Sequence, residues 1–576
     1  LLKATGFVKI TSTYTTKTAN GDIVFWANAD GGVDGYVAGS NGAITTGGGN
    51  FVAAGGTTTD ANGYPSGYAR ATEVSGVYGV LITAGVTTSG GDVIIRGEGP
   101  GGAASTINGG VELDTGAAIN TGAGDITITG RTASTNTSTG TNTYGIWMGN
   151  NSTAVSLTTT TGAITLNGDA SNNTTKTYRR GVLFNPATIT SGSGNISITG
   201  TGTNTTGTYD VWSNNTTIAS SITSTSGDVT ILGNGNGQTL FQKMTIGTGG
   251  TTLIRANNLS WDSTAASLTG TGPLIVEPIG TDWIAQSNTG NATGDLDMSN
   301  VTVTTGKSSV RIGKYNSSSS HSTKVVSAPS MSVAGPISIY GGDITLGAST
   351  VVTSANDNLL VKATGSIAQV ATPSITTKAG DLTLWSDSDA NKSGSILLGT
   401  VAPTAATVTT IGGEITIAGG LDDGASTVET GRTAGDNRPD GWAYSATAAG
   451  TGSWDSFGIM VFENSTISSG GGNMFFAGQS FESRSAVGSA MRFNEGVQVS
   501  AGSGTIHVYG KSLTPSVVRV YGTVLAGGSS TRAGSITTTG TQADSIVISG
   551  VVTGTAGRSP GTYIASGTSY LSLIHI

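Results

Sequence analysis

Isoleucine or valine alternates with serine or threonine in short segments along this chain, and each segment closes with glycine. Examples are "GNISITG" at Gly194–Gly200 and "GDITITG" at Gly124–Gly130. Because successive side chains of a strand point to opposite faces, Ile196 and Ile198 share one face and the hydroxyl groups share the other. The pattern predicts short, half-buried strands bounded by glycine bends. The same split is expected for the pairs Ile126/Ile128, Val229/Ile231, Ile415/Ile417 and Ile506/Val508.

The segments recur at a nearly constant spacing. The polar residues that precede them are 33 apart from Asp92 to Asp125 and again from Asp381 to Glu414. A period of 20–50 residues is typical of solenoids, propellers and arrays. Within residues 181–200 the order is "VLF", "ATIT" and "ISIT", which suggests three short strands in each period. We therefore predict an all-β fold, a right-handed parallel β-helix (solenoid) with three short strands per turn and loop insertions. The handedness follows the general preference for right-handed crossovers.

A longer duplication lies above this period. The segment "KATGFVKITSTYTTKTANGDIVFWANAD" (Lys3–Asp30) aligns without a gap with "KATGSIAQVATPSITTKAGDLTLWSDSD" (Lys362–Asp389). We predict one β-helix module over residues 1–358 and a truncated second module over 359–570, which continue one rigid rod. Residues 571–576, "LSLIHI", abandon the composition of the rest. We expect them to be a non-native tail on a fragment of a longer protein.

The composition agrees with stacked turns and excludes several functions. Only 10% of the 576 residues are charged, against about 25% in a typical domain. Stacking explains this, because like charges on adjacent turns would repel, whereas threonine and serine pairs are favourable. The net charge of −8 argues against a nucleic-acid partner. No apolar run is long enough for a transmembrane segment, and the absence of cysteine excludes disulfides and thiolate metal sites.

Two stretches resemble a known family. They are "LLVKATGSIAQVATPSITTKAGDLTLWSDSDANKSGSILLG" (Leu359–Gly399) and "VAGPISIYGGDITLGAST" (Val333–Thr350). Both are similar to repeats of filamentous-haemagglutinin-type bacterial exoproteins and of autotransporter passengers. The resemblance implies a secreted adhesin on the bacterial cell surface, exported through an outer-membrane secretion partner. Its expected partners are host or environmental surface glycans or proteins.

Other functions remain open on the same fold. The first alternative is a polysaccharide-binding or polysaccharide-degrading β-helix protein; an ice-binding or amyloid-like structural protein is a weaker one. A degrading enzyme would need clustered carboxylates, often with a basic partner, on adjacent turns. The sequence has one Asp-Asp pair, Asp422-Asp423, and we expect His321 in a solvated loop and His507 at an outward strand position. We therefore predict no enzyme activity, no cofactor and no metal site.

Two matched insertions concentrate the residues that the repeats avoid. They are Thr57–Gly79 and Leu421–Gly458, each of which follows a "GG" pair. Loops on a rigid scaffold often carry recognition, and aromatic and arginine side chains are common anchors. Tryptophan or tyrosine beside aspartate would suit a sugar. The opposing interpretation is that the insertions are local caps that pack aromatic rings against the rod. The candidate ligand-binding residues are Asp60, Tyr64, Tyr68, Arg70, Arg432, Asp436, Arg438, Asp440, Trp442, Tyr444, Trp454 and Asp455.

Overall fold

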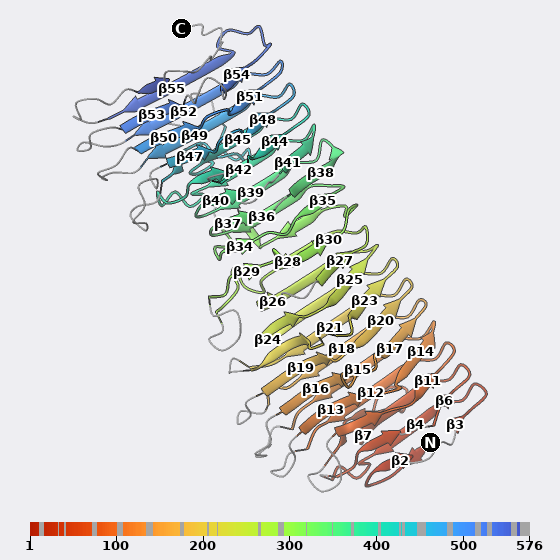
Figure 1. The fold of residues 1–576 in the computed structure, drawn as a ribbon. Coiled ribbons are helices and arrows are strands. Elements are labelled where there is room, and N and C mark those ends of the chain that lie inside the picture. The colour runs from red at the N-terminus through yellow and green to blue at the C-terminus, as the bar shows by residue number, and fades with distance from the viewer. Residues whose placement is uncertain are drawn as a thin grey trace. The chain divides into compact units, whose positions relative to one another are not determined.

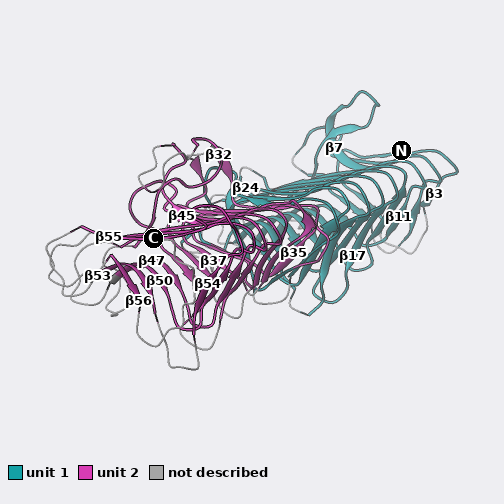
Figure 2. Cartoon of the chain, turned by 90° about the horizontal axis from the view of Figure 1, so that it is seen from above, with its two compact units in different colours: residues 1–295, 300–302 teal, residues 296–299, 303–576 magenta. Residues whose placement is uncertain are grey.

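The structure is all-β in the part of the chain that it describes, and every element there is a strand. The computed structural model describes residues 1–10, 16–32, 34–39, 42–71, 78–100, 107–133, 142–172, 178–203, 207–215, 217–262, 266–285, 293–317, 320–347, 349–369, 374–400, 405–424, 428, 433–445, 457–480, 488–512, 520–526, 533–553 and 561–564. The chain forms two compact units (Figure 2). Unit 1 comprises residues 1–295 and 300–302, and unit 2 comprises 296–299 and 303–576.

Unit 1 contains three ladders of parallel strands, in which each strand pairs with a counterpart from the next repeat (Figure 1). The first ladder comprises β1 (Leu2–Lys3), β4 (Ile23–Ala27), β7 (Phe51–Thr59), β12 (Val93–Glu98), β15 (Ile126–Arg131), β18 (Ile164–Asp169), β21 (Ile196–Thr201), β24 (Val229–Phe241), β26 (Thr252–Trp261) and β28 (Leu274–Glu277). The second comprises β2 (Val8–Ile10), β5 (Val37–Gly39), β10 (Tyr78–Ile82), β13 (Ile107–Leu113), β16 (Asn142–Met148), β19 (Tyr178–Phe184) and β22 (Tyr209–Ser213). The third comprises β3 (Thr16–Lys17), β6 (Ile44–Thr45), β11 (Gly85–Thr87), β14 (Ala118–Gly122), β17 (Val155–Thr159), β20 (Ala187–Ser191), β23 (Ser220–Ser224), β25 (Met244–Thr248) and β27 (Ala266–Thr269).

Unit 2 repeats this organisation with its own three parallel ladders. One comprises β31 (Val310–Ile312), β36 (Ile337–Gly341), β39 (Leu359–Ala363), β42 (Leu382–Ser386), β45 (Ile415–Gly419), β49 (Met474–Ser480), β52 (Ile506–Ser512) and β55 (Ile546–Val552). Another comprises β29 (Leu296–Asp297), β34 (Val326–Ser327), β37 (Ile344–Leu346), β40 (Ile367–Gln369), β43 (Ile396–Leu398), β47 (Phe457–Val461), β50 (Gly488–Phe493), β53 (Val520–Leu525) and β56 (Thr562–Ile564). The last comprises β35 (Met331–Val333), β38 (Ser349–Ala355), β41 (Ser374–Lys378), β44 (Thr407–Thr409), β48 (Thr466–Ser468), β51 (Gln498–Ser500) and β54 (Ser535–Thr537).

The alternating pattern sets the buried face of these strands, as predicted. Ile126 is paired in register with Ile164, which pairs with Ile196, which pairs with Val229. All four side chains are buried, while the threonines and serines between them are partly exposed. Stacking identical aliphatic positions removes apolar surface from water without placing any charge inside, which favours this register over a one-residue slip. The interior of unit 1 is therefore a continuous column of aliphatic side chains.

The aspartates and asparagines that precede the strands link successive repeats. The side-chain oxygen of Asp22 accepts a hydrogen bond from the amide of Asn50 (2.8 Å), and Asn50 does the same for Asp92 (2.7 Å). Asp92 in turn accepts from the amide of Asp125 (2.8 Å). Unit 2 repeats the device between Asn358 and Asp381, Asp381 and Glu414, and Asn473 and Thr505. At these steps the spacing of the polar residues thus reflects a hydrogen bond that satisfies the backbone amide just before each strand.

A column of glycines allows the turns to stack closely beside these polar residues. A Cβ atom on Gly162 would lie 1.9 Å from the carbonyl oxygen of Gly124, and one on Gly194 would lie 1.9 Å from that of Gly162. Neither distance is compatible with a side chain, so only glycine fits where the backbones approach this closely. At these positions glycine is therefore required by the close approach of neighbouring backbones.

One expectation about the surface is wrong. His321 does not lie in a solvated loop: it ends β33 (Ser320–His321), which pairs antiparallel with β32 (Tyr315–Ser317), and its side chain is buried. The Nε2 atom of His321 lies 2.7 Å from Ser388 Oγ, and its Nδ1 atom lies 2.8 Å from the carbonyl oxygen of Ser322. Because both ring nitrogens have partners, the imidazole can leave water without losing hydrogen bonds. His507 does occupy the outward position of β52, as expected.

The fold class is confirmed as an all-β, β-solenoid-like fold of parallel ladders. The module boundaries at 358 and 570 stay a prediction, because the two compact units are defined by contacts and not by the sequence duplication. The tail at 571–576 lies outside the described residues.

Candidate functional site

The first insertion folds back on the strand that precedes it. Strand β7 passes into a turn at Asp60 and returns as β8 (Pro65–Gly67), which pairs antiparallel with β7. The Oδ1 atom of Asp60 accepts hydrogen bonds from the amides of Asn62 (3.0 Å) and Tyr64 (3.1 Å). Asp60 therefore shapes the turn, as aspartate commonly does when its side chain bonds to the backbone two residues on.

Tyr64 fastens this insertion to the ladder of unit 1. Its hydroxyl group donates to Asp22 Oδ2 (2.7 Å) and accepts from Asn50 Nδ2 (2.8 Å). Burial, together with the hydrogen bond to Asp22, raises the pKa of the Tyr64 phenol. The tyrosine contacts the same two residues that link successive repeats, so the insertion is anchored to the polar column of the scaffold.

The other two candidate residues of the first insertion, Tyr68 and Arg70, belong to a cluster of ion pairs and a cation–π contact. Arg70, in β9 (Ala69–Arg70), pairs with Glu98 (2.5 Å), and Arg131 pairs with the same carboxylate (2.6 Å). The Arg131 guanidinium also lies 3.9 Å from the centroid of the Tyr68 ring. The Glu98 side chain is only 4% exposed, and the two arginines neutralise its buried carboxylate. These contacts favour the cap interpretation for the first insertion.

The second insertion is anchored at the corresponding place by a different side chain. Arg438 donates to Asp381 Oδ2 (2.8 Å) and also pairs with Glu414. Asp381 and Glu414 are the linked ladder residues of unit 2, as Asp22 and Asn50 are in unit 1. The Arg438 guanidinium, which lies between two carboxylates, thus anchors the second insertion as the Tyr64 hydroxyl anchors the first.

The remaining acidic residues of the second insertion bond to its backbone. Asp422 accepts from the amides of Gly435 (2.5 Å) and Asn437 (2.8 Å), and Asp436 accepts from that of Arg438 (2.9 Å). Asp440 is buried, and its Oδ2 accepts from the amide of Gly424 (2.7 Å). Arg432, Trp454 and Asp455 lie outside the described residues.

The two insertions return to their ladders in the same way. Gly55 pairs with Gly67 in the first copy, and Gly419 pairs with Gly441 in the second. Three residues later, Arg70 bridges Gly35 and Tyr444 bridges Gly394, each in an antiparallel sense. The parallel register then matches positions across the copies: Tyr68 with Trp442, Arg70 with Tyr444, Glu98 with Gln479, and Arg131 with Lys511. The duplication therefore extends from sequence to tertiary contacts.

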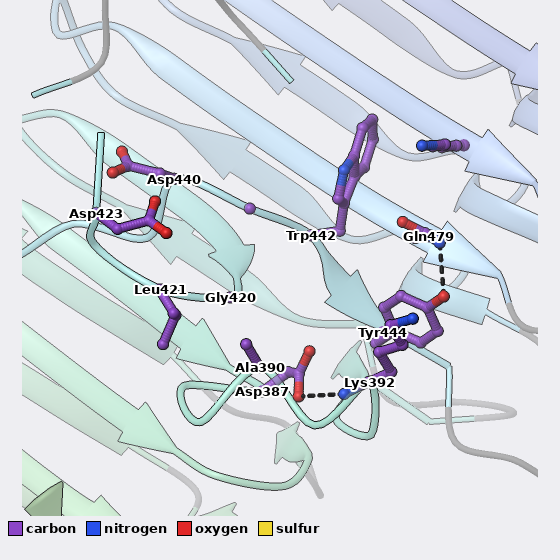
Figure 3. A pocket seen from close by; sticks show the side chains of 12 residues that line it. Asp387, Ala390, Lys392, Gly420, Leu421, Asp423, Asp440, Trp442, Tyr444 and Gln479 are labelled. Atoms are coloured by element: carbon purple, nitrogen blue, oxygen red, sulfur yellow. Dashed lines mark hydrogen bonds between the residues drawn. The ribbon is translucent and has the colours of Figure 1, made fainter. Parts of the chain in front are cut away.

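A pocket of about 370 Å³ lies in unit 2 where the second insertion meets its ladder. Three of the candidate residues line it, namely Asp440, Trp442 and Tyr444. Figure 3 shows the carboxylates of Asp423 and Asp440 at one side, and Trp442, Tyr444 and Gln479 at the other. The lining also includes Asp387, Ala390, Lys392, Leu421 and Lys511. Aromatic surface, acids, an amide and two lysines thus converge on one concavity, which is typical of a ligand site.

The aromatic side of the pocket is built by β46 (Ala443–Tyr444) and the residue before it. Trp442 packs against the cluster of Ala418, Phe475 and Ala477. The Tyr444 hydroxyl accepts a hydrogen bond from Gln479 Nε2 (2.7 Å; Figure 3). Alternate residues of an extended segment point the same way, so Trp442 and Tyr444 present their rings together. Packing holds Trp442 and the hydrogen bond holds Tyr444; because the Tyr444 ring is only 5% exposed, the partly buried Trp442 provides most of the accessible aromatic surface.

The opposite wall contains a carboxyl group with an altered affinity for protons. Burial raises the pKa of Asp387 to about 7, although the amides of Ser393 (3.2 Å) and Lys392 (3.0 Å) donate to it and oppose the shift. Asp387, Ala390 and Lys392 all have positive φ angles (48°, 54° and 68°). The carboxylate thus organises a tight turn whose outer surface forms part of the wall.

Three of the pocket residues are candidate ligand-binding residues named from the sequence, and four further pocket residues lie outside the insertions and were not named there. Asp387, Lys392, Gln479 and Lys511 come from turns and ladder strands outside the insertions. A signal for one of them was present: the duplication aligns Asp387 with Asn28, at a position that follows Trp385 as Asn28 follows Trp26. Gln479 and Lys511 could be placed only by strand register, which the sequence pattern does not fix for these repeats.

The described side chains also bear on metal binding and on serine–histidine chemistry. Within the described ranges no group of three His, Cys, Asp or Glu side chains is placed to hold a metal ion. A serine–histidine pair exists at Ser388 and His321, but both side chains are buried, at 2% and 4% exposure, and neither is among the residues that line the pocket. The pair therefore ties β33 to the turn at Asp387.

The fold and the site define a β-solenoid-like protein with a pocket on an insertion. Comparison of the chain with protein-family models, with curated proteins and with solved structures finds no match. In the described part of the chain, no helix has the length and apolar character required to cross a membrane.

Proposed function

We propose that this chain is part of an extracellular bacterial surface adhesin. In this proposal the β-helix is a stiff scaffold, and the second insertion carries the surface that attaches the cell to glycans or proteins of a host or of the environment. Export through an outer-membrane secretion partner belongs to the same proposal. It rests on the family resemblance of Leu359–Gly399 and on the site described above.

The observation that carries the proposal is the pocket beside Trp442 and Tyr444. The outward positions of the strands are mostly threonine and serine, which offer small hydroxyl groups at regular intervals. The pocket gathers two aromatic rings and several charged groups beside these strands. Aromatic anchors in a concave site are the usual basis of recognition, whereas isolated surface hydroxyls bind weakly.

The proposal includes a right-handed coil with three short strands in each turn. From β10 to β21 each strand pairs with the strand three places further on, as in β16–β19, β17–β20 and β18–β21. This order supports three strands per turn, and the strong preference for right-handed parallel crossovers supports the hand. An experimental map that resolves the backbone tests both points directly.

Attachment is tested by displaying the chain on the surface of a non-adherent laboratory bacterium. We expect the displayed chain to increase retention of cells on glycan-coated or protein-coated surfaces under flow. The matched control is the same chain without Leu421–Asp440, which removes the first part of the insertion, including the pocket residues Leu421, Asp423 and Asp440, and leaves β45 and β49 in place.

Two results would contradict the proposal. Equal retention of cells with and without the displayed chain would remove the adhesin function. Release of new sugar ends from a polysaccharide by the purified chain would replace it with the degrading alternative.

A further inference from the structure

We propose that Arg180 and the aromatic rings around it, in the second ladder of unit 1, form a binding site for an acidic saccharide whose carboxylate pairs with the guanidinium. The site is built by strands β16, β19 and β22. It shares no residue with the second insertion, which belongs to unit 2. The ligand of this site therefore does not depend on what the second insertion binds.

The strand register places the residues of this site on three successive strands. Tyr144 of β16 pairs with Arg180 of β19, which pairs with Tyr209 of β22. The rings of Tyr209 and Trp212 stack, with centroids 4.3 Å apart and 15° between their planes. Because paired positions on adjacent strands are about 4.8 Å apart, the arginine on the middle strand has aromatic side chains on both sides.

These rings hold the guanidinium of Arg180 in place. Its Cζ atom lies 4.5 Å, 5.1 Å and 5.4 Å from three ring centroids, those of Trp212, Tyr144 and Tyr178. Cation–π contacts of this kind attract a cation without neutralising it, because the rings carry no net charge. The arginine is therefore positioned by its neighbours and keeps its positive charge.

Within the described residues no carboxylate pairs with Arg180, although its side chain is mostly buried at 9% exposure. The undescribed segments that precede the three strands, residues 134–141, 173–177 and 204–206, contain no aspartate or glutamate. A buried charge without a counter-ion is costly, so an anion that binds it has a large gain to make. Several other arginines of the chain are neutralised by an acid, namely Arg70, Arg131, Arg255 and Arg438.

Arg180 also has donors left for such an anion. Its Nη1 donates to the Tyr144 hydroxyl (2.6 Å) and to Asn142 Oδ1 (3.1 Å). Among the described residues neither Nε nor Nη2 has a partner; Nε is buried and Nη2 is not. The same two nitrogens bind a glutamate in Arg131 and in Arg255. The unused edge of the Arg180 guanidinium therefore matches a carboxylate.

The aromatic surface beside the guanidinium favours a sugar acid over a simple anion. Tyr178 is 39% exposed, and Tyr209 and Trp212 are partly exposed. Apolar ring surface with a few fixed polar groups is typical of small-molecule sites. A uronic or sialic acid combines a carboxylate with a ring whose C–H groups pack on aromatic surface and whose hydroxyl groups form hydrogen bonds.

The acid in the neighbouring row of side chains does not oppose an anion. Glu112 of β13 is in register with Trp147 of β16, two strands away from Arg180. Burial raises the pKa of Glu112 to about 8, and Asp114 adds to the shift. Glu112 is therefore largely uncharged at neutral pH.

Two other anionic partners fit this surface less well. Strands β16, β19 and β22 are each paired on both sides, so none offers a free edge to an extended acidic peptide. A nucleic acid requires several basic groups in a row, whereas the chain has a net charge of −8. A single cation among aromatic rings suits one acidic sugar residue.

The test measures sugar binding to the purified chain by ligand-observed saturation-transfer NMR. The acidic probes are the methyl glycosides of glucuronic acid and N-acetylneuraminic acid. Methyl glucoside is the neutral counterpart, glucosamine the cationic sugar and sodium acetate the simple anion. We expect at least one acidic glycoside to bind about tenfold or more tightly than methyl glucoside, because only the acid pairs with the guanidinium. Added salt should weaken this binding.

Three variants and a matched control locate the site. Arg180→Gln should weaken the acidic glycoside about tenfold or more, and Arg180→Lys should recover only part of the loss, because lysine keeps the charge without the fork. Tyr178→Ala removes an exposed ring, which makes it independent of any folding defect in Arg180→Gln, and should weaken binding about threefold. Lys9→Gln removes an equal charge from an exposed position of β2 in the same ladder and should leave the affinity within about twofold.

The outcomes distinguish this site from the proposed function. Equal binding of acidic and neutral glycosides, preference for glucosamine, binding of no sugar, or acetate binding as tight as that of the acidic glycosides overturns the assignment. Unchanged affinity in both Arg180→Gln and Tyr178→Ala, or an equal loss in Lys9→Gln and Arg180→Gln, also overturns it. Binding of an acidic glycoside without retention of displayed cells supports this site and removes the adhesin function. Retention of cells without such binding supports the adhesin function and overturns this site.

Discussion

Asp210 shows how a single carboxyl group can join separate parts of a repeat protein. It lies in β22 with no exposed surface. Its Oδ1 accepts from the amides of Gly202 (2.6 Å) and Gly237 (3.1 Å), and its Oδ2 accepts from that of Gly235 (3.1 Å). Burial raises its pKa from 3.8 to about 7, and the three amide hydrogen bonds oppose the shift. The charged form is therefore costly in the folded chain even though its oxygens have donors.

The raised pKa predicts that the stability of unit 1 falls as the pH rises. The folded chain keeps the proton of Asp210 up to about pH 7, whereas the unfolded chain releases it near its ordinary value of 3.8. The stabilising contribution is thus complete below pH 4 and is lost as the pH passes through 7, at no more than about 1.4 kcal/mol per pH unit. We expect Asp210→Asn to flatten the fall in melting temperature between pH 5 and pH 8.

The exposed Asp30 provides the control, because Asp30→Asn should leave the slope of the wild-type profile unchanged. The asparagine at 210 loses the acceptor for Gly235, so its melting temperature at pH 5 should be lower than that of the wild type. Parallel pH profiles for the wild type and Asp210→Asn would contradict the assignment of the slope to this group.

Arg438 and Tyr64 hold their insertions with different chemistry, and their effects should differ accordingly. The Arg438 side chain and its two carboxylate partners are each about a third exposed. We therefore expect Arg438→Ala to cost no more than about 1 kcal/mol of global stability. It should instead speed hydrogen exchange in residues 433–441, which fold around Asp422. Salt should reduce this protection in the wild type, whereas the two hydrogen bonds that Tyr64→Phe removes should be much less sensitive to salt.

For the strands, the sequence predicts which side chains are buried wherever the alternation of apolar and polar positions alone decides it. Alternation predicted that Ile126, Ile196 and Val229 are buried, because a strand offers only two faces and one must leave water. The polar residue before each strand served only as a marker of spacing, yet Asp92 and Asp125 turn out to be hydrogen-bonded to each other. Pattern could locate that residue but could not supply its partner, since the partner lies one repeat away.

The same reasoning failed where tertiary contacts override local composition. "SSSSHST" predicts a solvated loop because serine is typical of exposed turns, but His321 is buried through its contacts with Ser388 and Ser322. The candidate site was located only in part for a similar reason. Trp442 and Tyr444 were named because the repeats rarely contain such residues, while Lys511 and Gln479 belong to ordinary strands and reach the pocket through register.

The glycine column makes a sharp prediction at this scale. In Gly162→Ala the new methyl group would overlap the carbonyl oxygen of Gly124, and the backbone on both sides belongs to adjacent turns. We expect a loss of about 3 kcal/mol or more in the free energy of unfolding, because neither backbone can move without breaking its ladder. Gly6→Ala is the control, since no heavy atom lies within 4 Å of its Cβ position. A change of less than about 0.5 kcal/mol in Gly162→Ala would refute the packing explanation.

For the chain as a whole, the duplication preserves a scaffold and varies what is attached to it. Trp26 donates to the Gly56 carbonyl oxygen (2.7 Å) and Trp385 donates to that of Gly420 (2.7 Å). Lysine covers each indole, with Lys3 at 3.7 Å and Lys362 at 3.4 Å from the ring centroid. These contacts occur immediately before each insertion and are unchanged between the copies. At the pocket, by contrast, four matched positions differ between the copies, namely Tyr68/Trp442, Arg70/Tyr444, Glu98/Gln479 and Arg131/Lys511.

This separation predicts that the first part of the second insertion, Leu421–Asp440, can be removed without unfolding the chain. Gly419 and Gly441 are paired across its base, so deletion of Leu421–Asp440 leaves two ends that already lie side by side. The aliphatic interior of unit 2 comes from ladder strands such as β45 and β49, and none of their residues is deleted. We expect the β-sheet circular dichroism to be retained and the melting temperature to fall by a few degrees at most, in line with the loss of exposed ion pairs. Retention of displayed cells under flow should be lost at the same time, because the walls formed by Leu421, Asp423 and Asp440 are gone. A collapse of the circular dichroism signal would mean that the insertion is part of the folding unit, and the division between scaffold and site would then be wrong.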